Sequence, residues 1–406
     1  MIALTLALRN LWKNRRRSLA TLLAIGIGFA AVNLFAGYIA NTYAGLRDSS
    51  IYGEGLGHLT IARNGYFANG SLQPERYILS PDDLTRLTRL LREDSRIEVI
   101  SPRLSASGLV SNGKLSTIFI AEGEDPALAN RIWQHSNARF RLDPQKPAGG
   151  LVSKALAERL GVGPHGNLVT MASTLEGQIN ALDLDVLQVW DTGNAATNDK
   201  TLRLPLGYLQ QLLDTEGASR VVVLLTPGTD ADTLRSALQP RLRAAGFDME
   251  IKTWVELSSY YRQVKRLFDL IFAFLFTIVF IVVLMSIINT LSMSVMERVR
   301  EIGTLRALGM QRLAVIRIFA TEGALLGIAG SLAGAVLTCT LIALIHFGHI
   351  TYTPPASSTP VPLSIAFLPG MLGATLAILT LIATLAACWP ARRAARLEIV
   401  DALGHI

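Results

Sequence analysis

Residues Leu270–Met293 read LIFAFLFTIVFIVVLMSIINTLSM and carry no charged side chain. Farther along the chain, no Asp, Glu, Lys or Arg occurs between Gly323 and Ala391. A helix needs about 20 apolar residues to cross the ~30 Å hydrocarbon core of a bilayer. This part of the chain offers three such runs, at Leu270–Met293, Ile318–His346 and Ile365–Cys388. We therefore expect a membrane protein.

A fourth apolar run lies near the start of the chain. Ser18–Leu46 contains no charged residue and follows a basic segment. A secretory signal peptide is the alternative interpretation, but the apolar region of a signal peptide spans only about 7–15 residues. The run in this chain is longer than that, which favours a first transmembrane helix that is retained.

The basic residues gather at the ends of the apolar runs. The chain has a formal net charge of +7, yet only 17% of its residues are charged. Membrane proteins hold Lys and Arg in cytoplasmic loops, so both termini and the loop after the second run are predicted to be cytoplasmic. This placement argues against a nucleic-acid partner. The clusters are Lys13 with Arg15, Arg16 and Arg17, then Arg298, Arg300, Arg306, Arg312 and Arg317, and finally Arg392, Arg393 and Arg396.

The segment Ile51–Lys265 reads as a large soluble domain on the outer side of the membrane. Short runs of alternating or apolar residues predict strands at Gly57–Ala62, Glu98–Ser101, Leu115–Ala121, Asn167–Ala172, Asp185–Trp190 and Val221–Thr226. Capping residues predict helices at Ser80–Glu93, Ser153–Leu160 and Asp230–Ala245, with Pro240 expected to disturb the last. Strands mixed with a few helices indicate an α+β domain.

No catalytic or metal-binding motif stands out in the chain. His58, His135 and His165 are scattered, and Asp183 with Asp185 form only a weak carboxylate pair. The sequence has no G-x-x-x-x-G-K-[ST] phosphate loop. Its two cysteines lie inside predicted spans, where packing is their expected role. We therefore expect a non-catalytic membrane subunit that binds no cofactor directly.

Two helical features adjoin the second apolar run. Asp248–Leu267 is predicted to be a helix that starts outside and continues unbroken into the span, as a stalk. On the inner side, Met296–Met310 reads MERVREIGTLRALGM, with apolar residues at helical spacing. We expect an amphipathic surface helix with Glu297–Arg300 or Arg298–Glu301 pairs, ended by Gly309. A basic loop that merely happens to be helical is the open alternative.

Small residues mark one face of the third run. Gly323, Gly327, Gly330 and Gly334 form the G-x-x-x-G spacing twice, which lets helix backbones approach closely. Glu322 precedes them, and we expect it to snorkel or to pair with a nearby arginine. No span carries a row of charges at mid-depth, so passage of an ion or a sugar through the bundle is not indicated.

Several segments resemble the FtsX-type permeases of ABC transporters in the MacB, LolC/LolE and FtsX superfamily. The resemblance is carried by MERVREIGTLRALGMQRLAVIRIFATEGALLGIAGSLAGAVL (296–337) and by WPARRAARLEIVDAL (389–403). In the outer domain, LVSKALAERLGVGPHGNLV (151–169) is similar to the family's periplasmic element. The start, LRNLWKNRRRSLATLLAIGIG (8–28) with GHLTIARNGYF (57–67), is most similar to LolC/LolE-related permeases.

The resemblance implies a four-span α-helical permease of the bacterial inner membrane, with a MacB-like α+β periplasmic domain between helices 1 and 2. The expected parts are a cytoplasmic N-terminus (1–17), first span and stalk (18–48), periplasmic domain (49–253), stalk and second span (254–294), coupling helix (295–312), third span (314–346), periplasmic loop (347–363), fourth span (364–389) and cytoplasmic C-terminus (390–406).

The resemblance also implies partners. A separate ABC ATPase dimer would supply ATP and Mg²⁺, because MacB carries its ATPase on the same chain and this sequence starts at the permease. A second permease, identical or not, and a periplasmic adaptor, chaperone or lipoprotein would complete the assembly within membrane lipid. The residues expected to contact the ATPase are Glu297, Arg298, Arg300, Glu301, Leu305, Arg306 and Gly309, with a further cytoplasmic contact at Arg392, Arg393 and Arg396.

Three functions remain open at this point. The first is lipoprotein or amphiphile extraction, and the second is export by mechanotransmission, in which ATP-driven closure inside moves the stalks and the outer domains. The third is FtsX-like regulation of a periplasmic cell-wall hydrolase, in which the outer domain binds a partner and nothing is transported. A membrane-anchored enzyme or sensor is a more distant alternative. The identity of a substrate is not legible in the sequence.

The charge pattern generates a topology prediction. In a background without Cys339 and Cys388, cysteines introduced at Asn69 and Gly228 should react with an impermeant maleimide added to intact spheroplasts. A cysteine at Thr304 should react only after the membrane is permeabilised, because it lies on the predicted cytoplasmic helix. Labelling of Thr304 from outside would contradict this topology.

Overall fold

The computed structural model describes residues 15–134, 141–193, 195–353 and 360–396. The chain divides into two compact units. The membrane unit comprises Met1–Tyr43, Val264–Ile350 and Pro362–Ile406, and the core domain comprises Ala44–Gln263 with Thr351–Val361. The helices α2 (Arg15–Asp48) and α11 (Ser259–Met296) each run unbroken through the boundary between the units.

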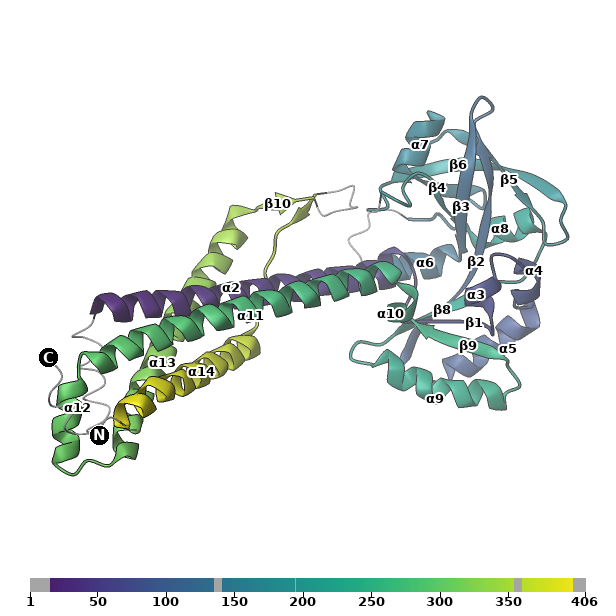
Figure 1. Ribbon diagram of the computed structural model, residues 1–406. Helices are drawn as coiled ribbons and strands as arrows, with labels where there is room; N and C mark the ends of the chain where they lie inside the picture. Colours follow the sequence, from purple (N-terminus) through teal and green to yellow (C-terminus); the bar gives the residue numbers. More distant parts are fainter. Residues whose placement is uncertain (1–14, 135–140, 194, 354–359, 397–406) are drawn as a thin grey trace. The chain divides into compact units, whose positions relative to one another are not determined.

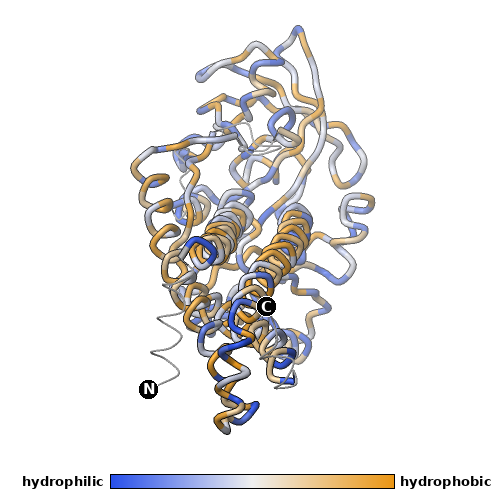
Figure 2. Tube along the Cα trace, turned by 60° about the vertical axis from the view of Figure 1, so that its left-hand side comes forward, coloured by the Kyte–Doolittle hydropathy of each residue, from blue (hydrophilic) through white to orange (hydrophobic). Residues whose placement is uncertain are grey.

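Four long apolar helices build the membrane unit (Figures 1 and 2). They are α2, α11, α13 (Arg312–Gly348) and α14 (Pro369–Ala395), and a short helix, α12 (Val299–Ala307), lies between α11 and α13. Each is long and apolar enough to cross a bilayer. The chain is thus a multi-pass membrane protein with four candidate spans, as its apolar runs predict. The membrane boundaries within these helices stay predictions.

Glycines on α13 allow close contact with two neighbouring helices. A Cβ atom added at Gly323 would lie 2.6 Å from both the Ala383 carbonyl oxygen and the Ala387 Cβ on α14. At Gly330, such an atom would lie 2.7 Å from the Ile25 Cβ on α2. Gly327 faces α14 and Gly334 faces α2 in the same way. The lower half of the glycine row therefore contacts α14 and the upper half contacts α2.

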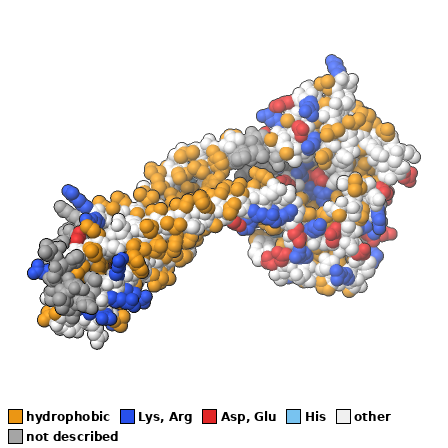
Figure 3. Space-filling model, viewed as in Figure 1, with side chains coloured by type: hydrophobic (Ala, Val, Ile, Leu, Met, Phe, Trp, Pro, Cys, Tyr) orange, Lys and Arg blue, Asp and Glu red, His pale blue; other side chains and the backbone are white. Residues whose placement is uncertain are grey.

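The helices α2 and α11 also pack against each other along their length. An added Cβ at Gly28 would lie 2.8 Å from the side chain of Val279. The hydroxyls of Thr21 and Thr290 share a hydrogen bond of 2.6 Å. Farther out, Phe35 stacks on Phe272 with ring centroids 6.3 Å apart. The opposite side of α11 remains exposed and apolar, which suits contact with lipid or with another membrane helix (Figure 3).

The core domain contains nine strands whose sheet closes partly on itself. The order is β3-β7-β4-β6-β5-β2-β8-β1-β9, and β3 also pairs with β2, so six strands from β2 to β7 form a barrel. The strands are β1 (Leu59–Arg63), β2 (Ile97–Ser111), β3 (Ser116–Glu124), β4 (Gly149–Ser153), β5 (Asn167–Ser173), β6 (Ile179–Trp190), β7 (Thr201–Pro205), β8 (Arg220–Leu225) and β9 (Met249–Thr253).

Two hydrophobic cores correspond to the two parts of this sheet. The barrel interior is filled by aliphatic side chains and Phe119, and α8 (Leu206–Leu213) packs against them. The remaining strands, β8, β1 and β9, are covered by α5 (Pro81–Arg92) and α9 (Ala231–Ala244). The long strand β2 belongs to both parts, because its first half pairs with β8 and its second half with β5. This strand holds the two parts in one domain.

Short helices fill the connections. They are the π-helix η1 (Ser49–Gly53), α3 (Tyr66–Asn69), α4 (Pro74–Tyr77), α6 (Pro126–Trp133), α7 (Lys154–Leu160) and α10 (Trp254–Leu257). The two-residue strands β10 (Thr351–Tyr352) and β11 (Val361–Pro362) follow α13. Ser80 and Asp230 cap α5 and α9 as their sequences predict, and Gly161 ends α7 in the left-handed conformation.

Three strands and two helices escaped the sequence prediction. β4 starts with Gly149 and Gly150, whose absent side chains make room for Leu187 and Leu204, whereas a glycine pair usually indicates a turn. β7 carries a charged residue and ends in proline, and β9 occupies part of the segment predicted as a continuous helix from Asp248. The prediction that α11 starts near Asp248 is therefore wrong, because the helix begins at Ser259. The two helices are α6 and α8.

Pro240 does not interrupt α9. It lies on the exposed side of the helix, where water can bond to the main-chain carbonyl that the proline leaves without a donor. Leu234, Leu238 and Leu242 on the opposite side are fully buried. Burial of that apolar side outweighs the single lost hydrogen bond.

The glycine contacts generate a packing prediction. Leucine at Gly327 or Gly330 would overfill a helix contact, and overpacking of this kind costs about 1–3 kcal/mol. Either variant should lower the yield of monodisperse protein after extraction in a mild detergent. Gly373→Leu on α14 is the matched control, because open space surrounds that glycine. Equal yields for all three variants would show that the glycine face contacts lipid.

Candidate coupling site

The short helix α12 presents one buried and one exposed side. Val299, Ile302 and Gly303 are buried, and Ile302 joins a small core with residues of α11, α13 and α14. Arg300, Glu301 and Thr304 are exposed on the other side. The apolar spacing read from the sequence therefore describes how α12 is attached to the bundle, and its polar residues remain available to a partner.

Gly309 ends this helix in a defined way. Its φ of +96° lies in the left-handed region that favours glycine. The amide of Gly309 donates to the carbonyl of Arg306, and the amide of Met310 donates to that of Leu305, each at 3.0 Å. These two bonds form a Schellman motif. The motif lets α13 start two residues later, at Arg312.

Arg298 is buried, which differs from the surface position expected for it. It lies in the turn between α11 and α12 with 7% of its surface exposed, and its charge acts on Glu322 of α13, which is 3% exposed. The two opposite charges are taken out of water together, so removing either would strand the other. The expectation that Glu322 has an arginine nearby agrees with this arrangement. Arg298 is therefore positioned to hold α12 on α13.

Glu297 binds a different partner from the one predicted. Its carboxylate accepts a hydrogen bond from Arg17 of α2 at 2.5 Å. The prediction of pairs one turn apart, Glu297–Arg300 and Arg298–Glu301, is wrong for the described residues, because the helix breaks between Met296 and Val299. The Glu297–Arg17 contact ties the start of α2 to the end of α11 instead.

The end of α14 completes this region. Ala391, Ala394 and Ala395 are buried beside α12 and α13, and the small side chains permit that approach. Arg392 and Arg393 in the last turn, with Arg396 at its C-cap, point to the exposed side. Cations in the last turn of a helix are favoured by the helix dipole. The remaining C-terminal motif, Ala402–Leu403, lies outside the described residues.

Exposed leucines accompany the polar side of α12. Leu305 is 38% exposed, Leu308 80% and Leu313, in the first turn of α13, 54%. Sequence analysis singled out Leu305 but missed Leu308 and Leu313, because both follow or precede a turn and so break the helical spacing. Leucines beside Arg300, Glu301 and the half-buried Arg306 make a mixed surface of the kind found at protein interfaces. We call residues 300–313 the coupling surface.

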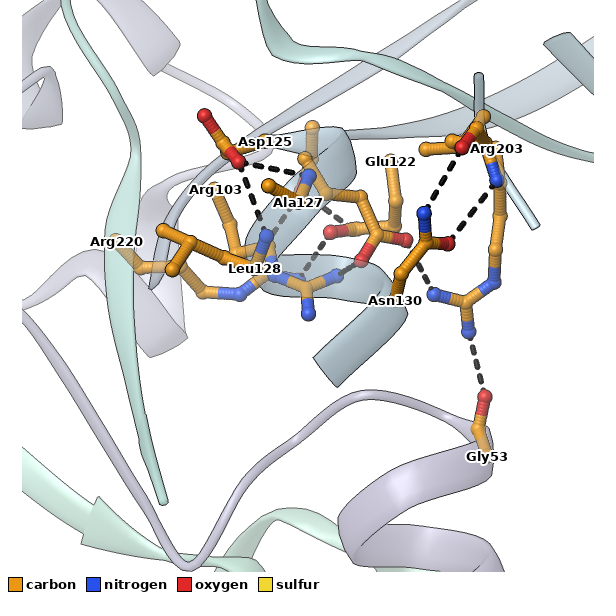
Figure 4. A network of polar contacts seen from close by, with 12 residues as sticks. Gly53, Arg103, Glu122, Asp125, Ala127, Leu128, Asn130, Arg203 and Arg220 are labelled. Carbon is orange, nitrogen blue, oxygen red and sulfur yellow. Dashed lines mark hydrogen bonds and ion pairs between the residues drawn. The ribbon is translucent and has the colours of Figure 1, made fainter. Parts of the chain in front are cut away.

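A second polar cluster lies inside the core domain, where charged residues of three strands meet (Figure 4). Glu124 of β3 is completely buried, and it forms ion pairs with Arg103 of β2 and, at 2.5 Å, with Arg203 of β7. Beside it, Arg220 of β8 binds Glu122 at 2.6 Å. Although burial would raise the pKa of Glu122, the Arg220 guanidinium lowers that pKa below its ordinary value.

This buried network also holds the chain that follows α2. Arg203 donates to the carbonyl of Gly53, the last residue of η1, at 2.6 Å (Figure 4). At Gly55, where φ is +75°, an added Cβ would lie 3.3 Å from Arg103 Nη1 and 3.4 Å from Arg203 Nη1. Burial raises the pKa of the neighbouring Glu54 carboxyl. The residues after α2 are thereby fastened to the barrel strands by charge-assisted bonds.

Comparison with known proteins assigns both units. Residues 18–241 match the MacB-like periplasmic core domain, and residues 273–399 match the FtsX-like permease C-terminal domain. The first match covers more than half of the chain. The chain belongs to the MacB/FtsX family of ABC permeases. The prediction of this family, and of an α+β periplasmic domain between the first two of four membrane helices, is confirmed; a LolC-type specificity is not.

Relatives of this FtsX-type permease align with nearly the whole chain. The pyoverdine export ATP-binding/permease protein PvdT of Pseudomonas savastanoi pv. phaseolicola is 23% identical, with 99% of this chain and 59% of the relative covered. The PvdT of Pseudomonas aeruginosa is 22% identical, with 99% and 58% covered. An uncharacterized ABC transporter permease of Methanocaldococcus jannaschii, MJ1507, is 26% identical over 37% of this chain and 38% of its own length. The chain thus spans less than two thirds of the PvdT proteins.

Among solved structures, the periplasmic region of MacB from Actinobacillus actinomycetemcomitans covers 50% of this chain and 92% of its own, with 12% identity and a TM-score of 0.36. The extracellular domain of the transporter YknZ from Gram-positive bacteria covers 48% and 99%, with 14% identity and a TM-score of 0.33. The matched part of each is a domain of the MacB-like type.

The buried network generates a stability prediction for the MacB-like domain. Glu124→Ala would leave Arg103 and Arg203 buried without a counterion, and losing one partner of a buried ion pair costs about 3–5 kcal/mol. The apparent melting temperature of the purified permease should fall by several degrees. Glu176→Ala, which removes an exposed glutamate, should leave it unchanged. Equal melting temperatures for both variants would mean that the network is not stabilising.

Proposed function

We propose that this permease couples ATP hydrolysis by a separate ABC ATPase dimer to work done by its MacB-like domain on the outer side of the bacterial inner membrane. The coupling surface on α12 carries the proposal. It combines exposed leucines with unburied Arg and Glu side chains, and α12 is attached to three of the four long helices. A push on α12 would therefore reach α11, α13 and α14 together.

Energy has to enter through such a contact. The 406 residues contain no phosphate loop, and the PvdT relatives are named for both an ATP-binding and a permease function. ATP and Mg²⁺ are accordingly assigned to the partner ATPase. Glu297, through Arg17, and Arg298, beside Glu322, would pass displacement from the surface into α2 and α13. Arg392, Arg393 and Arg396 offer a second cytoplasmic contact.

The long helices suit mechanotransmission. Both α2 and α11 continue without a break from the membrane unit into the core domain. In the core domain, the end of α2 leads through η1 to Gly53, whose carbonyl is bound by Arg203. Displacement of α2 would therefore act on the barrel strands. Charged side chains do not line the apolar windows of the four spans in the described chain, which argues against an aqueous path through the bundle.

The proposed assembly contains a second permease subunit, identical or homologous, beside the exposed apolar side of α11. The proposed substrate is an amphiphile or a lipoprotein that is released or exported on the outer side. The name of the PvdT relatives, which refers to pyoverdine export, supports export as the class of work. A periplasmic adaptor or chaperone would receive the substrate. Both termini are placed in the cytoplasm by the positive-inside pattern.

The coupling surface generates a test. Leu308→Asp and Glu301→Lys should each reduce, by about tenfold or more, the ATPase activity that co-purifies with the tagged permease from its native membranes, because desolvated interface residues carry most binding energy. Neither should lower the yield of the permease itself, since both side chains are exposed.

The matched controls lie on the core domain. Leu72 is 78% exposed and Glu176 is exposed, so Leu72→Asp and Glu176→Lys make the same chemical changes away from the coupling surface. If the two variants on α12 retained as much ATPase activity as these controls, the ATPase would bind elsewhere. The arginines at the end of α14 would then be tested next.

A further inference from the structure

The strand β9 forms an edge of the core-domain sheet. It stands at the end of the strand order and, within the described residues, pairs only with β1. An edge strand presents main-chain amides and carbonyls that are free to pair with another polypeptide. The helix α9 lies alongside this edge (Figure 1).

The hydrogen-bond pattern shows which groups of β9 point outward. Asn64 donates to Asp248, and Trp254 donates to His58, each at 3.2 Å. Because hydrogen-bonded pairs alternate along an antiparallel ladder, the even-numbered residues of β9 bond to β1. The main-chain groups of Met249, Ile251 and Thr253 therefore point away from β1, to the open side.

Side chains already occupy two of these outward groups. Gln239 of α9 donates its amide to the Met249 carbonyl at 2.9 Å, and Glu256 accepts from the Thr253 amide at 2.9 Å. Between them, the outward amide and carbonyl of Ile251 have no hydrogen-bond partner among the described residues. Ile251 is thus a free pairing position flanked by two side chains that imitate a neighbouring strand.

A groove of about 480 Å³ follows this edge. Its wall is α9, which lines it with Arg235, Gln239 and Arg243, and its other side is β9 with Met249 and Ile251. The three α9 residues are spaced four apart, so they lie on one side of the helix. Arg235 is neutralised by Asp232 and Glu256, whereas Arg243 is exposed and has no ion-pair partner in the described part of the chain.

We propose that this groove binds an extended, acidic peptide segment of a partner protein, which adds to β9 as a tenth strand. The peptide residue opposite Ile251 would exchange two main-chain bonds with it, as in other cases of strand addition. Side chains of paired residues share a sheet face, so every second peptide side chain would face α9.

The spacing of the arginines sets the sequence of the peptide. Arg235 and Arg243 are eight residues apart on the helix, which is about 12 Å along its axis. Four residues of a strand cover about 13 Å. Acidic residues at positions one and five of an extended segment would therefore face the two arginines, with the middle residue near Gln239. Repulsion would exclude basic segments from the same groove.

The test uses the full-length permease purified in detergent and the fluorescein-labelled peptide SEVTVES at low ionic strength. Fluorescence anisotropy should show that SEVTVES binds at least fivefold more tightly than SKVTVKS, since a favourable surface charge pair contributes up to about fivefold. SEVTVES with an N-methylated central threonine should bind at least tenfold more weakly, because the methyl group removes a main-chain donor.

Variants assign the binding to this groove. Arg243→Glu should lower the affinity for SEVTVES at least fivefold and should reverse the preference toward SKVTVKS. Arg92→Glu makes the same charge change at an exposed position of α5 outside the groove, and it should have no such effect. The permease fold is not at risk in either variant, because both arginines are exposed.

Hydrogen–deuterium exchange distinguishes strand addition from simple charge attraction. In the free protein the Ile251 amide should exchange faster than the Glu250 and Lys252 amides, which bond to β1. Saturating SEVTVES should slow the exchange of Ile251 at least tenfold. Equal binding of the acidic and basic peptides, no binding of SEVTVES, or an Ile251 amide that stays unprotected would each overturn the proposal.

Discussion

The absence of water from a bilayer core is the constraint on which this structure depends. Main-chain groups there must bond within their own segment, so the apolar runs form uninterrupted helices and polar interactions are confined to helix ends. Association of such helices relies on packing, because lipid is as apolar as the side chains. The glycines of α13 answer this requirement by letting α13 touch both α14 and α2.

The helix ends then carry the polar contacts that orient the bundle. Arg17 binds Glu297, and Arg298 is buried beside Glu322. The short helix α12 sits among these contacts with its apolar side on the ends of α13 and α14. Its exposed side is left with leucines and charges, which is why a cytoplasmic partner can be expected there. Stability and coupling thus use opposite sides of one helix.

The core domain solves a different problem, that of fastening a helix to a sheet in water. Closure of β2 to β7 into a barrel removes strand edges, and the buried Arg103, Glu124 and Arg203 join three of its strands. Buried charges of this kind favour specificity of arrangement over net stability. Here they fix the residues that follow α2. The one long edge, at β9, is left outside the barrel, where α9 lines a groove.

Much of this organisation follows from the sequence alone. The length and apolarity of four runs determine four spans, since only a helix satisfies its own main chain in lipid. The family is legible in the residues around α12 and in the C-terminal motif. The glycine row indicates close packing because glycine alone permits it. Turn and cap residues placed α5, α7 and α9, and alternation placed six of the nine strands.

The tertiary structure decided which charges are buried and which are free. Arg298 and Arg300 are two residues apart and look equivalent in the sequence, yet α11 ends between Met296 and Val299 and turns one inward and the other outward. Strands β4 and β7 were hidden because glycines and an arginine are unfavourable there until Leu187, Leu204 and Glu124 arrive from distant segments. Likewise, the open side of β9 exists only because β1 occupies the other. Such partners are set by contacts between distant parts of the chain, and local sequence holds no record of them.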